Sequence, residues 1–296
     1  MERLSARIDI LPPSMALFAA THIVMHGFDH AEDIIQRLRS NLNHPDAAVY
    51  LDELYRHLDF IKALTFWPQV KNDQALVSKL YETDGFFFAE GSRYPHKLLV
   101  VFTTMFNNFR ISNALLYAMI QELGVSTLFL KDCTYFNFLN GVSGLGTDIY
   151  SITRAISSLI REHHISEIFI TGFSSGGYAS LYASFLLPCA GYLGLSVPTD
   201  MSRESTLFPG KYFKDEVRNK IDEKYLINLR VLAESTNDRV SREIVFGEKS
   251  AGDAAHASNM AGLPNLKITK LSSGHQTVGA LIENHAFLDC FRKLLF

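Results

Sequence analysis

From residue 84 onward, short apolar runs alternate with amphipathic stretches. Leu98–Phe102 is a continuous apolar run, as expected of a strand that is buried on both faces. The stretches 110–122 and 148–162 carry apolar residues at helical spacing, and Gly124 ends the first of them. Strands that alternate with helices through short connections form a parallel, doubly wound sheet. We therefore predict an α/β fold with a doubly wound, mostly parallel sheet.

Further strands and one more helix complete this pattern. The run 266–271 alternates between apolar and polar residues, which places it near an edge of the sheet. The closing stretch 276–295 is amphipathic and is predicted to be one helix. The other predicted strands are 86–88, 125–130, 168–171, 192–195 and 243–247.

The N-terminal part of the chain has a different pattern, which is mostly helical. Helices are predicted over 31–42 and 47–64 because leucines and isoleucines recur there at helical spacing. We therefore divide the chain into a helical appendage, residues 1–80, and an α/β domain, residues 81–296. The residues of the appendage do not indicate its role, and a protein partner that binds through it is one expectation.

Three histidines of the appendage, His22, His26 and His30, are spaced four residues apart. On a helix they would share one face, where they could bind a metal. However, Gly27 weakens such a helix, and no paired carboxylate or cysteine completes a ligand set. We interpret them as ordinary histidines and expect neither a metal nor a cofactor.

The stretch 166–187 combines a strand, a tight turn and a helix around one serine. Ile168–Thr171 is a short apolar strand, and the apolar residues from Tyr178 onward fall three or four apart, as on a helix. Between them the chain has the spacing Gly-x-Ser-x-Gly, centred on Ser174. A serine hydroxyl becomes a nucleophile when a base takes its proton, and a sharp turn exposes the hydroxyl to that base.

The residues around Ser174 suit this chemistry. Gly172 and Gly176 remove side chains that would clash at a sharp turn. The amide of Ser175 lies at the start of the helix, where exposed N–H groups and the helix dipole favour an oxyanion. We predict that Ser174 is a nucleophile and that the Ser175 N–H stabilises the oxyanion.

The strand, turn and helix closely resemble the nucleophile elbow of the α/β-hydrolase superfamily, and the resemblance covers residues 84–296. It implies a triad in the order Ser, Asp or Glu, His, with each residue at the C-terminal end of a strand. His275 follows the last predicted strand and is the expected base. Asp253 follows the preceding strand and is the expected acid, with Glu248 and Asp200 as alternatives.

The resemblance also implies a second oxyanion donor in the loop after strand 98–102. That loop reads Thr103-Thr104-Met105 and lacks the usual His-Gly, which argues against the lipases and esterases with a His-Gly-Gly-Gly stretch. The expected donor is the backbone N–H of Met105 or that of Thr104.

The loops at the same edge of the sheet are expected to line the substrate pocket. Cys133 has no base beside it in the sequence, so we interpret it as a buried thiol rather than a nucleophile. Residues 201–230 are charged and lie where the superfamily often inserts a cap over the site. The positions assigned to substrate binding are Thr103, Phe173, Asp132 and Cys133.

Charge and composition indicate which classes of partner and which location to expect for the protein. The net charge is −3 and no long basic stripe occurs, so nucleic acid is not an expected partner. The three cysteines lie far apart, which indicates neither a disulfide framework nor a zinc ribbon. The amino terminus is charged where a signal peptide is apolar, and no stretch reaches the roughly 18 apolar residues of a membrane span. We expect a cytoplasmic protein.

Together these features predict a serine hydrolase that cleaves a carboxylic ester, or removes an acetyl group, through an acyl-enzyme. A looser likeness to hydrolase-like proteins of bacterial cell-surface glycan assembly lies in the run 172–179 and in the long loop 132–146. It favours a small acyl ester on a sugar as the substrate. Two alternatives stay open, an acyltransferase with the same triad and a non-catalytic scaffold with this fold.

Overall fold

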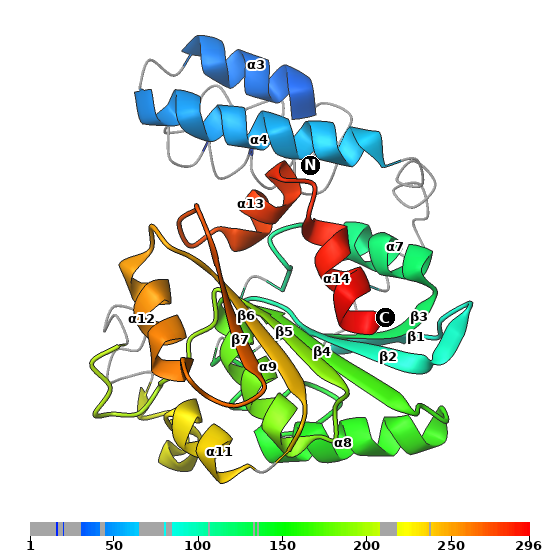
Figure 1. The fold of residues 1–296 in the computed structure, drawn as a ribbon. Coiled ribbons are helices and arrows are strands. Elements are labelled where there is room, and N and C mark those ends of the chain that lie inside the picture. Colours follow the sequence, from blue (N-terminus) through cyan, green and yellow to red (C-terminus); the bar gives the residue numbers. More distant parts are fainter. Residues whose placement is uncertain are drawn as a thin grey trace.

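A mostly parallel sheet runs through the centre of the protein (Figure 1). The computed structural model describes residues 16, 20, 31–41, 45–64, 80, 85–105, 107–132, 134, 136–207, 218–236 and 238–296. Within these residues the sheet has seven strands in the order β1-β3-β2-β4-β5-β6-β7. Only β1 is antiparallel to its neighbour, and the predicted edge strand, β7, is at an edge. The strands are β1 Phe86–Ala89, β2 Tyr94–Phe102, β3 Val125–Leu130, β4 Glu167–Phe173, β5 Gly191–Leu195, β6 Ser241–Gly247 and β7 Leu266–Leu271.

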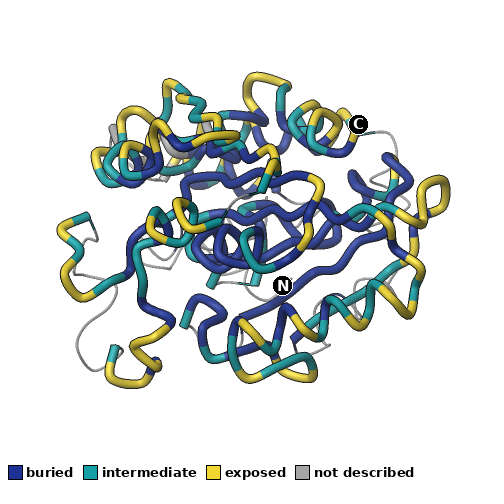
Figure 2. The backbone as a smooth tube through the Cα atoms, turned by 60° about the horizontal axis from the view of Figure 1, so that its bottom comes forward, coloured by how far each residue is buried: buried dark blue, intermediate teal, exposed yellow. Residues whose placement is uncertain are grey.

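Helices cover both faces of the sheet, as the predicted doubly wound fold requires. Successive residues of β2 point to opposite faces, so Leu98 and Val100 pack in one core while Leu99 and Val101 pack in the other. The first core also contains residues of α8 Ile149–Glu162, α9 Ser175–Leu186, α11 Leu229–Ser235 and α12 Ala251–Met260. The second contains residues of α7 Asn113–Leu123, α13 Thr277–Glu283 and α14 Phe287–Leu295. In Figure 2 the central strands are accordingly dark blue, while outward-facing helical positions are yellow.

The order of the strands creates a topological switch point between β2 and β4. The chain passes from β2 outward to β3, then crosses back over β2 to β4 and continues to β5 on the other side. The loops that leave the C-terminal ends of β2 and β4 therefore diverge between two neighbouring strands. Open parallel sheets bind their ligands at such a switch point. Here the two loops carry Met105 and Ser174.

Two predicted helices differ from the observed ones. The helix predicted over 110–122 begins only at Asn113, because Arg110 has a positive φ of 66° and Ser112 caps the helix by accepting the Leu115 N–H. The helix predicted over 276–295 is two helices, α13 and α14. The break lies at His285, whose φ of 53° is left-handed and ends α13.

The described part of the appendage is helical, with α3 Ala31–Asn41 and α4 Pro45–Ala63 as predicted. Its apolar residues, among them Ile34 and Leu54, form a small core of their own, while Ile61 joins the core around α13. The predicted boundary near residue 80 and the histidines His22, His26 and His30 lie outside the described residues, except for Leu80 itself. The division into two domains therefore stays a prediction.

Helix α4 is joined to α13 through a buried histidine. His57 has only 4% of its surface exposed, and its ring makes a hydrogen bond to the backbone of Gly279. Burial, together with the positive charges of Arg110 and Arg56, lowers the pKa of His57 to about 4. Arg56, the residue before His57, also forms an ion pair with Glu283 of α13 at 3.2 Å.

This histidine is expected to make the protein less stable in acid. The unfolded chain binds the proton near pH 6.5 and the folded chain only near pH 4, so stability falls as the pH is lowered through that window. The loss attributable to His57 approaches roughly 3 kcal/mol at the acid end. Urea unfolding between pH 7 and pH 4 checks this, because His57→Gln should flatten the pH dependence relative to the unchanged chain. Parallel plots of the free energy of unfolding against pH for the two proteins would contradict this prediction.

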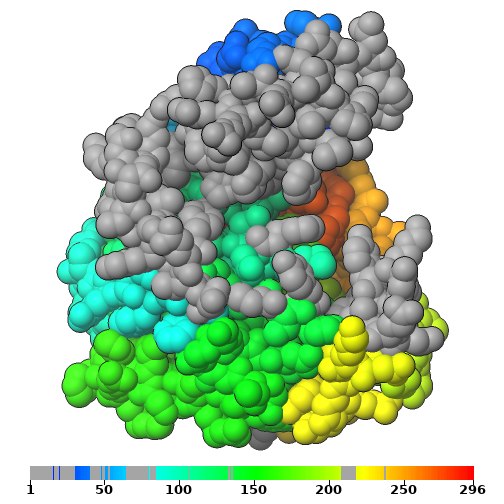
Figure 3. Space-filling model, turned by 180° about the vertical axis from the view of Figure 1, so that it is seen from behind, coloured from blue at the N-terminus to red at the C-terminus, as the bar shows by residue number. Residues whose placement is uncertain are grey.

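The segment predicted as a cap packs beside the helices of the first core. The hydroxyl of Tyr225 donates to Oδ2 of Asp148 at 2.6 Å, and the Tyr178 hydroxyl of α9 donates to the Tyr225 carbonyl at 2.8 Å. In Figure 3 the yellow atoms of residues 218–236 accordingly lie against green atoms. That this segment covers the site stays a prediction. Among the described helices, none combines the length and the apolar character that crossing a membrane requires.

Candidate active site

The loop after β4 is a sharp turn with Ser174 at its tip. Ser174 has φ 53° and ψ −119°, a conformation that costs a residue with a side chain about 1–3 kcal/mol. Two backbone hydrogen bonds hold it there, because the Ser174 N–H donates to Leu195 O at 2.9 Å and the Gly177 N–H donates to Ser174 O at 2.8 Å. The hydroxyl makes no capping bond to α9, which leaves it available for other partners.

The two glycines of the motif stand where a side chain would clash, as predicted. A Cβ on Gly172 would lie 2.2 Å from Oγ of Ser180, and one on Gly176 would lie 2.2 Å from the carbonyl oxygen of Thr103. Gly176 therefore lets the start of α9 touch the end of β2. This contact holds the loop after β2 against the turn that carries Ser174.

Ser174, His275 and Asp253 lie in one chain of hydrogen bonds. Oγ of Ser174 is 2.8 Å from Nε2 of His275. Nδ1 of the same ring is 2.8 Å and 3.1 Å from the two carboxylate oxygens of Asp253. A carboxylate only accepts, so Nδ1 carries the proton and the lone pair of Nε2 faces the serine hydroxyl. The ring is thus in the tautomer that can take a proton from Ser174.

Several contacts fix the position of the imidazole. The ring of Phe173 lies beside that of His275, with 5.8 Å between centroids. The carbonyl of His275 accepts the Ser196 hydroxyl at 2.8 Å and the Thr277 N–H at 2.9 Å. Ser196 Oγ also lies 3.0 Å from Thr277 Oγ1. The loop after β7 is therefore tied to the end of β5, and the ring is oriented from both sides.

Asp253 lies in the first turn of α12, and only 8% of its surface is exposed. The cap of that helix is Ser250, whose hydroxyl accepts the Asp253 N–H at 3.3 Å, so the aspartate does not cap the helix itself. The two alternative acids lie elsewhere. Glu248 forms an ion pair with Lys270 at 3.5 Å, and Asp200 accepts from the Ser202 backbone at 3.0 Å.

The predicted oxyanion donors have different partners. The N–H of Thr104 donates to Asn108 O at 2.8 Å, so it is used within its own loop. The N–H of Met105 points toward the elbow, where it donates to Oγ of Ser175 at 2.7 Å. The N–H of Ser175 is in the first turn of α9 beside Ser174, as predicted.

Comparison with solved structures identifies the fold. A protein from Agrobacterium vitis S4, described as a hydrolase, is 12% identical and superposes with a TM-score of 0.50, covering 71% of this chain and 92% of that one. The chain has the α/β-hydrolase fold. MenH from S. aureus is 14% identical with a TM-score of 0.48, covering 72% of this chain and 98% of that one. No model of a known protein family matches the sequence. A comparison with curated proteins finds no match.

Three of the side chains assigned to substrate binding have structural partners in this α/β-hydrolase fold. The Thr103 hydroxyl donates to Leu130 O at 2.7 Å and joins β2 to β3. Both carboxylate oxygens of Asp132 accept hydrogen bonds, from Thr134 at 2.9 Å and from the Phe138 N–H at 3.0 Å, so this buried aspartate organises its own loop.

Phe173 is buried, and its ring lies beside that of His275. A role of Thr103, Asp132 and Phe173 in substrate binding stays a prediction. Cys133 lies outside the described residues.

Sequence reasoning missed Ser196 and Thr277. Both act through the backbone carbonyl of His275, and nothing in the sequence links positions that are so far apart. The only local signal was that Thr277 lies two residues after the predicted base, His275. Their pairing depends on β5 and the loop after β7 meeting at the same edge of the sheet.

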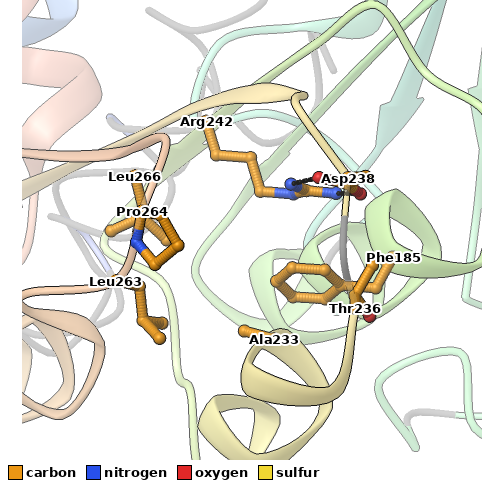
Figure 4. Close-up of a pocket in the computed structure, with 8 residues that line it drawn as sticks. All are labelled: Phe185, Ala233, Thr236, Asp238, Arg242, Leu263, Pro264 and Leu266. Atoms are coloured by element: carbon orange, nitrogen blue, oxygen red, sulfur yellow. Dashed lines mark hydrogen bonds and ion pairs between the residues drawn. The ribbon is translucent and has the colours of Figure 1, made fainter.

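A small pocket lies away from this site, around Arg242 at the start of β6 (Figure 4). The guanidinium forms an ion pair with Asp238 at 2.7 Å, donates to the Ser184 carbonyl at 2.7 Å and lies 4.2 Å from the centroid of the Phe185 ring. The charge is thus neutralised by the protein itself, and the group joins α9 to β6. Among the described residues, no group of three or more histidines, cysteines and carboxylates could hold a metal ion.

Proposed function

We propose that the protein is a serine hydrolase that cleaves a carboxylic ester through an acyl-enzyme on Ser174. The observation that carries the proposal is the chain of hydrogen bonds from Ser174 Oγ through His275 to Asp253. Three further features support it: the left-handed backbone of Ser174, the fold, and the position of the elbow at the switch point of the sheet.

The reaction follows from the roles of these groups. Ser174 Oγ attacks the ester carbonyl while Nε2 of His275 takes its proton. The carboxylate of Asp253 stabilises the imidazolium that forms, and the amide of Ser175 at the start of α9 faces the developing oxyanion. His275 then gives the proton to the leaving alcohol. A water molecule, activated by the same imidazole, releases the acid from Ser174.

A fluorophosphonate probe tests the proposal on the full chain. The phosphorus reacts with an activated serine and loses fluoride, so mass spectrometry should find one adduct, on the peptide that contains Ser174. Ser174→Ala should give a folded protein without that adduct. Labelling at Ser175 instead, or no labelling of the folded protein, would contradict the proposed nucleophile. Rates with p-nitrophenyl esters of increasing acyl length then measure how large an acyl group the site accepts.

A further inference from the structure

The oxyanion donors of this protein are arranged unusually. An α/β-hydrolase fold normally offers two backbone N–H groups to the oxyanion, one after the nucleophile and one from the loop after the neighbouring strand. Here the N–H of that loop, on Met105, already donates to Oγ of Ser175 at 2.7 Å. That length is at the short end for an N–H···O hydrogen bond. The Ser175 N–H would therefore be left as the only direct backbone donor.

The surrounding backbone holds the Met105 N–H and the Ser175 hydroxyl in contact. Gly176 brings the end of β2 against the start of α9, since a Cβ there would lie 2.2 Å from Thr103 O. The Thr104 N–H and the Asn107 N–H close the loop on themselves, through Asn108 O and Thr104 O, each at 2.8 Å. The loop is therefore held in the shape that directs the Met105 N–H at the side chain of Ser175.

The hydroxyl of Ser175 accepts this bond and has its own proton to donate. Among the hydrogen bonds of the described residues, Ser175 Oγ has Met105 as its partner and no acceptor for that proton. A hydroxyl that accepts from an N–H becomes a better donor, because each bond polarises the next. The oxygen belongs to the residue directly after Ser174, and it lies on the same residue as the Ser175 N–H. Both groups can therefore point at one oxygen atom.

We propose that Ser175 is a second catalytic serine, whose hydroxyl donates to the oxyanion together with its own backbone N–H. The Met105 N–H acts behind it, orienting and polarising the hydroxyl. No bond is made to Ser175 and its proton stays on Oγ throughout, so the step is a hydrogen bond that strengthens as negative charge develops on the substrate oxygen. This inference rests on the proposed function, because it needs a tetrahedral intermediate on Ser174.

Removing the Ser175 hydroxyl would change the rate of turnover in opposite directions if it is an oxyanion donor and if it only fills the oxyanion position. If the Ser175 hydroxyl merely occupied the place of the oxyanion on Met105, removing it would free that N–H and leave turnover equal or faster. If the hydroxyl is a donor, removing it slows both formation and hydrolysis of the acyl-enzyme, because both steps pass through an oxyanion.

Kinetics of Ser175→Ala and Ser175→Thr on p-nitrophenyl acetate decide between these. We expect Ser175→Ala to lower kcat by about 10²- to 10³-fold with KM within about twofold, since loss of one oxyanion donor has effects of that size. Ser175→Thr keeps the hydroxyl and should restore most of kcat. Affinity for a trifluoromethyl ketone, which forms a charged hemiketal with Ser174, should fall in Ser175→Ala in proportion to kcat/KM.

Three results would overturn the proposal. They are a kcat for Ser175→Ala that equals or exceeds that of the unchanged protein, a Ser175→Thr protein as slow as Ser175→Ala, or an unchanged affinity for the ketone. Circular dichroism and thermal unfolding of each variant separate a folding defect from lost chemistry. If the unchanged protein is neither labelled by the fluorophosphonate nor active, it is the proposed function that fails, which is distinguishable from these outcomes.

Discussion

Replacing Asp253 with asparagine is expected to lower kcat for ester hydrolysis by about 10⁴-fold while the protein stays folded. The Asp253 carboxylate now accepts the proton of His275 Nδ1, at 2.8 Å. An amide can turn its NH₂ group to that nitrogen and donate, which favours the tautomer with the proton on Nε2. Nε2 would then face Ser174 with a proton and could not take another. KM is expected to change little, because Asp253 does not face the substrate.

The matched control is Glu248→Gln, which changes the same kind of group on the same connection between β6 and α12. Glu248 forms its ion pair with Lys270 at the surface, whereas His275 is bonded to Asp253, so kcat should stay within about twofold. Steady-state kinetics of both variants, with active sites counted by fluorophosphonate labelling, make the comparison quantitative. A large loss in Glu248→Gln together with a small one in Asp253→Asn would show that the acid was wrongly assigned.

The arrangement of Ser174, His275 and Asp253 could be predicted because it depends on the order of elements rather than on side-chain packing. In a parallel sheet every strand ends at the same edge, so residues that follow β4, β6 and β7 meet there even though they are far apart in sequence. The sharp turn at Ser174 was likewise indicated by Gly172 and Gly176, and the positive φ of Ser174 agrees with it. Apolar patterning placed the strands, and the resemblance to α/β-hydrolases supplied the order of the triad residues.

Other features could not be predicted because local hydrogen bonds decide them. Asp132 follows β3 at the edge of the sheet where the site lies, but the sequence did not indicate that its carboxylate accepts the Thr134 and Phe138 N–H groups. The stretch 276–295 kept its amphipathic period across a break, so hydrophobic spacing gave no sign that the left-handed His285 separates α13 from α14.

The hydrogen bonds of the loop after β2, at the site itself, could not be predicted from the sequence either. Sequence order placed Met105 and Thr104 there but did not indicate that both amides are already bonded. The Thr104 N–H donates to the Asn108 carbonyl, and the Met105 N–H donates to the Ser175 hydroxyl. Such bonds form between groups whose relative position exists only in the folded chain.

Gly176→Ala is the second variant with a large expected effect, because it acts on stability and on chemistry together. Its Cβ would lie 2.2 Å from Thr103 O and 2.5 Å from Phe102 O, and neither backbone oxygen can move aside as a flexible side chain would. We expect a loss of about 1–3 kcal/mol in the free energy of unfolding, the usual effect of overpacking. The loop that carries Met105 must also shift away from Ser175, and displacements of about 1 Å near reacting groups lower rates by about 10²-fold.

Gly252→Ala is the matched control for this variant. Gly252 lies in α12 with no atom within 4 Å of the added Cβ, so alanine should leave kcat unchanged and keep or raise the thermal midpoint, because alanine favours helix. Thermal unfolding followed by circular dichroism, with kcat measured on the same samples, separates the two glycines. If Gly176→Ala matched Gly252→Ala in both measurements, the close approach of α9 to β2 would have no part in holding the loop, and Met105 would be positioned by other contacts.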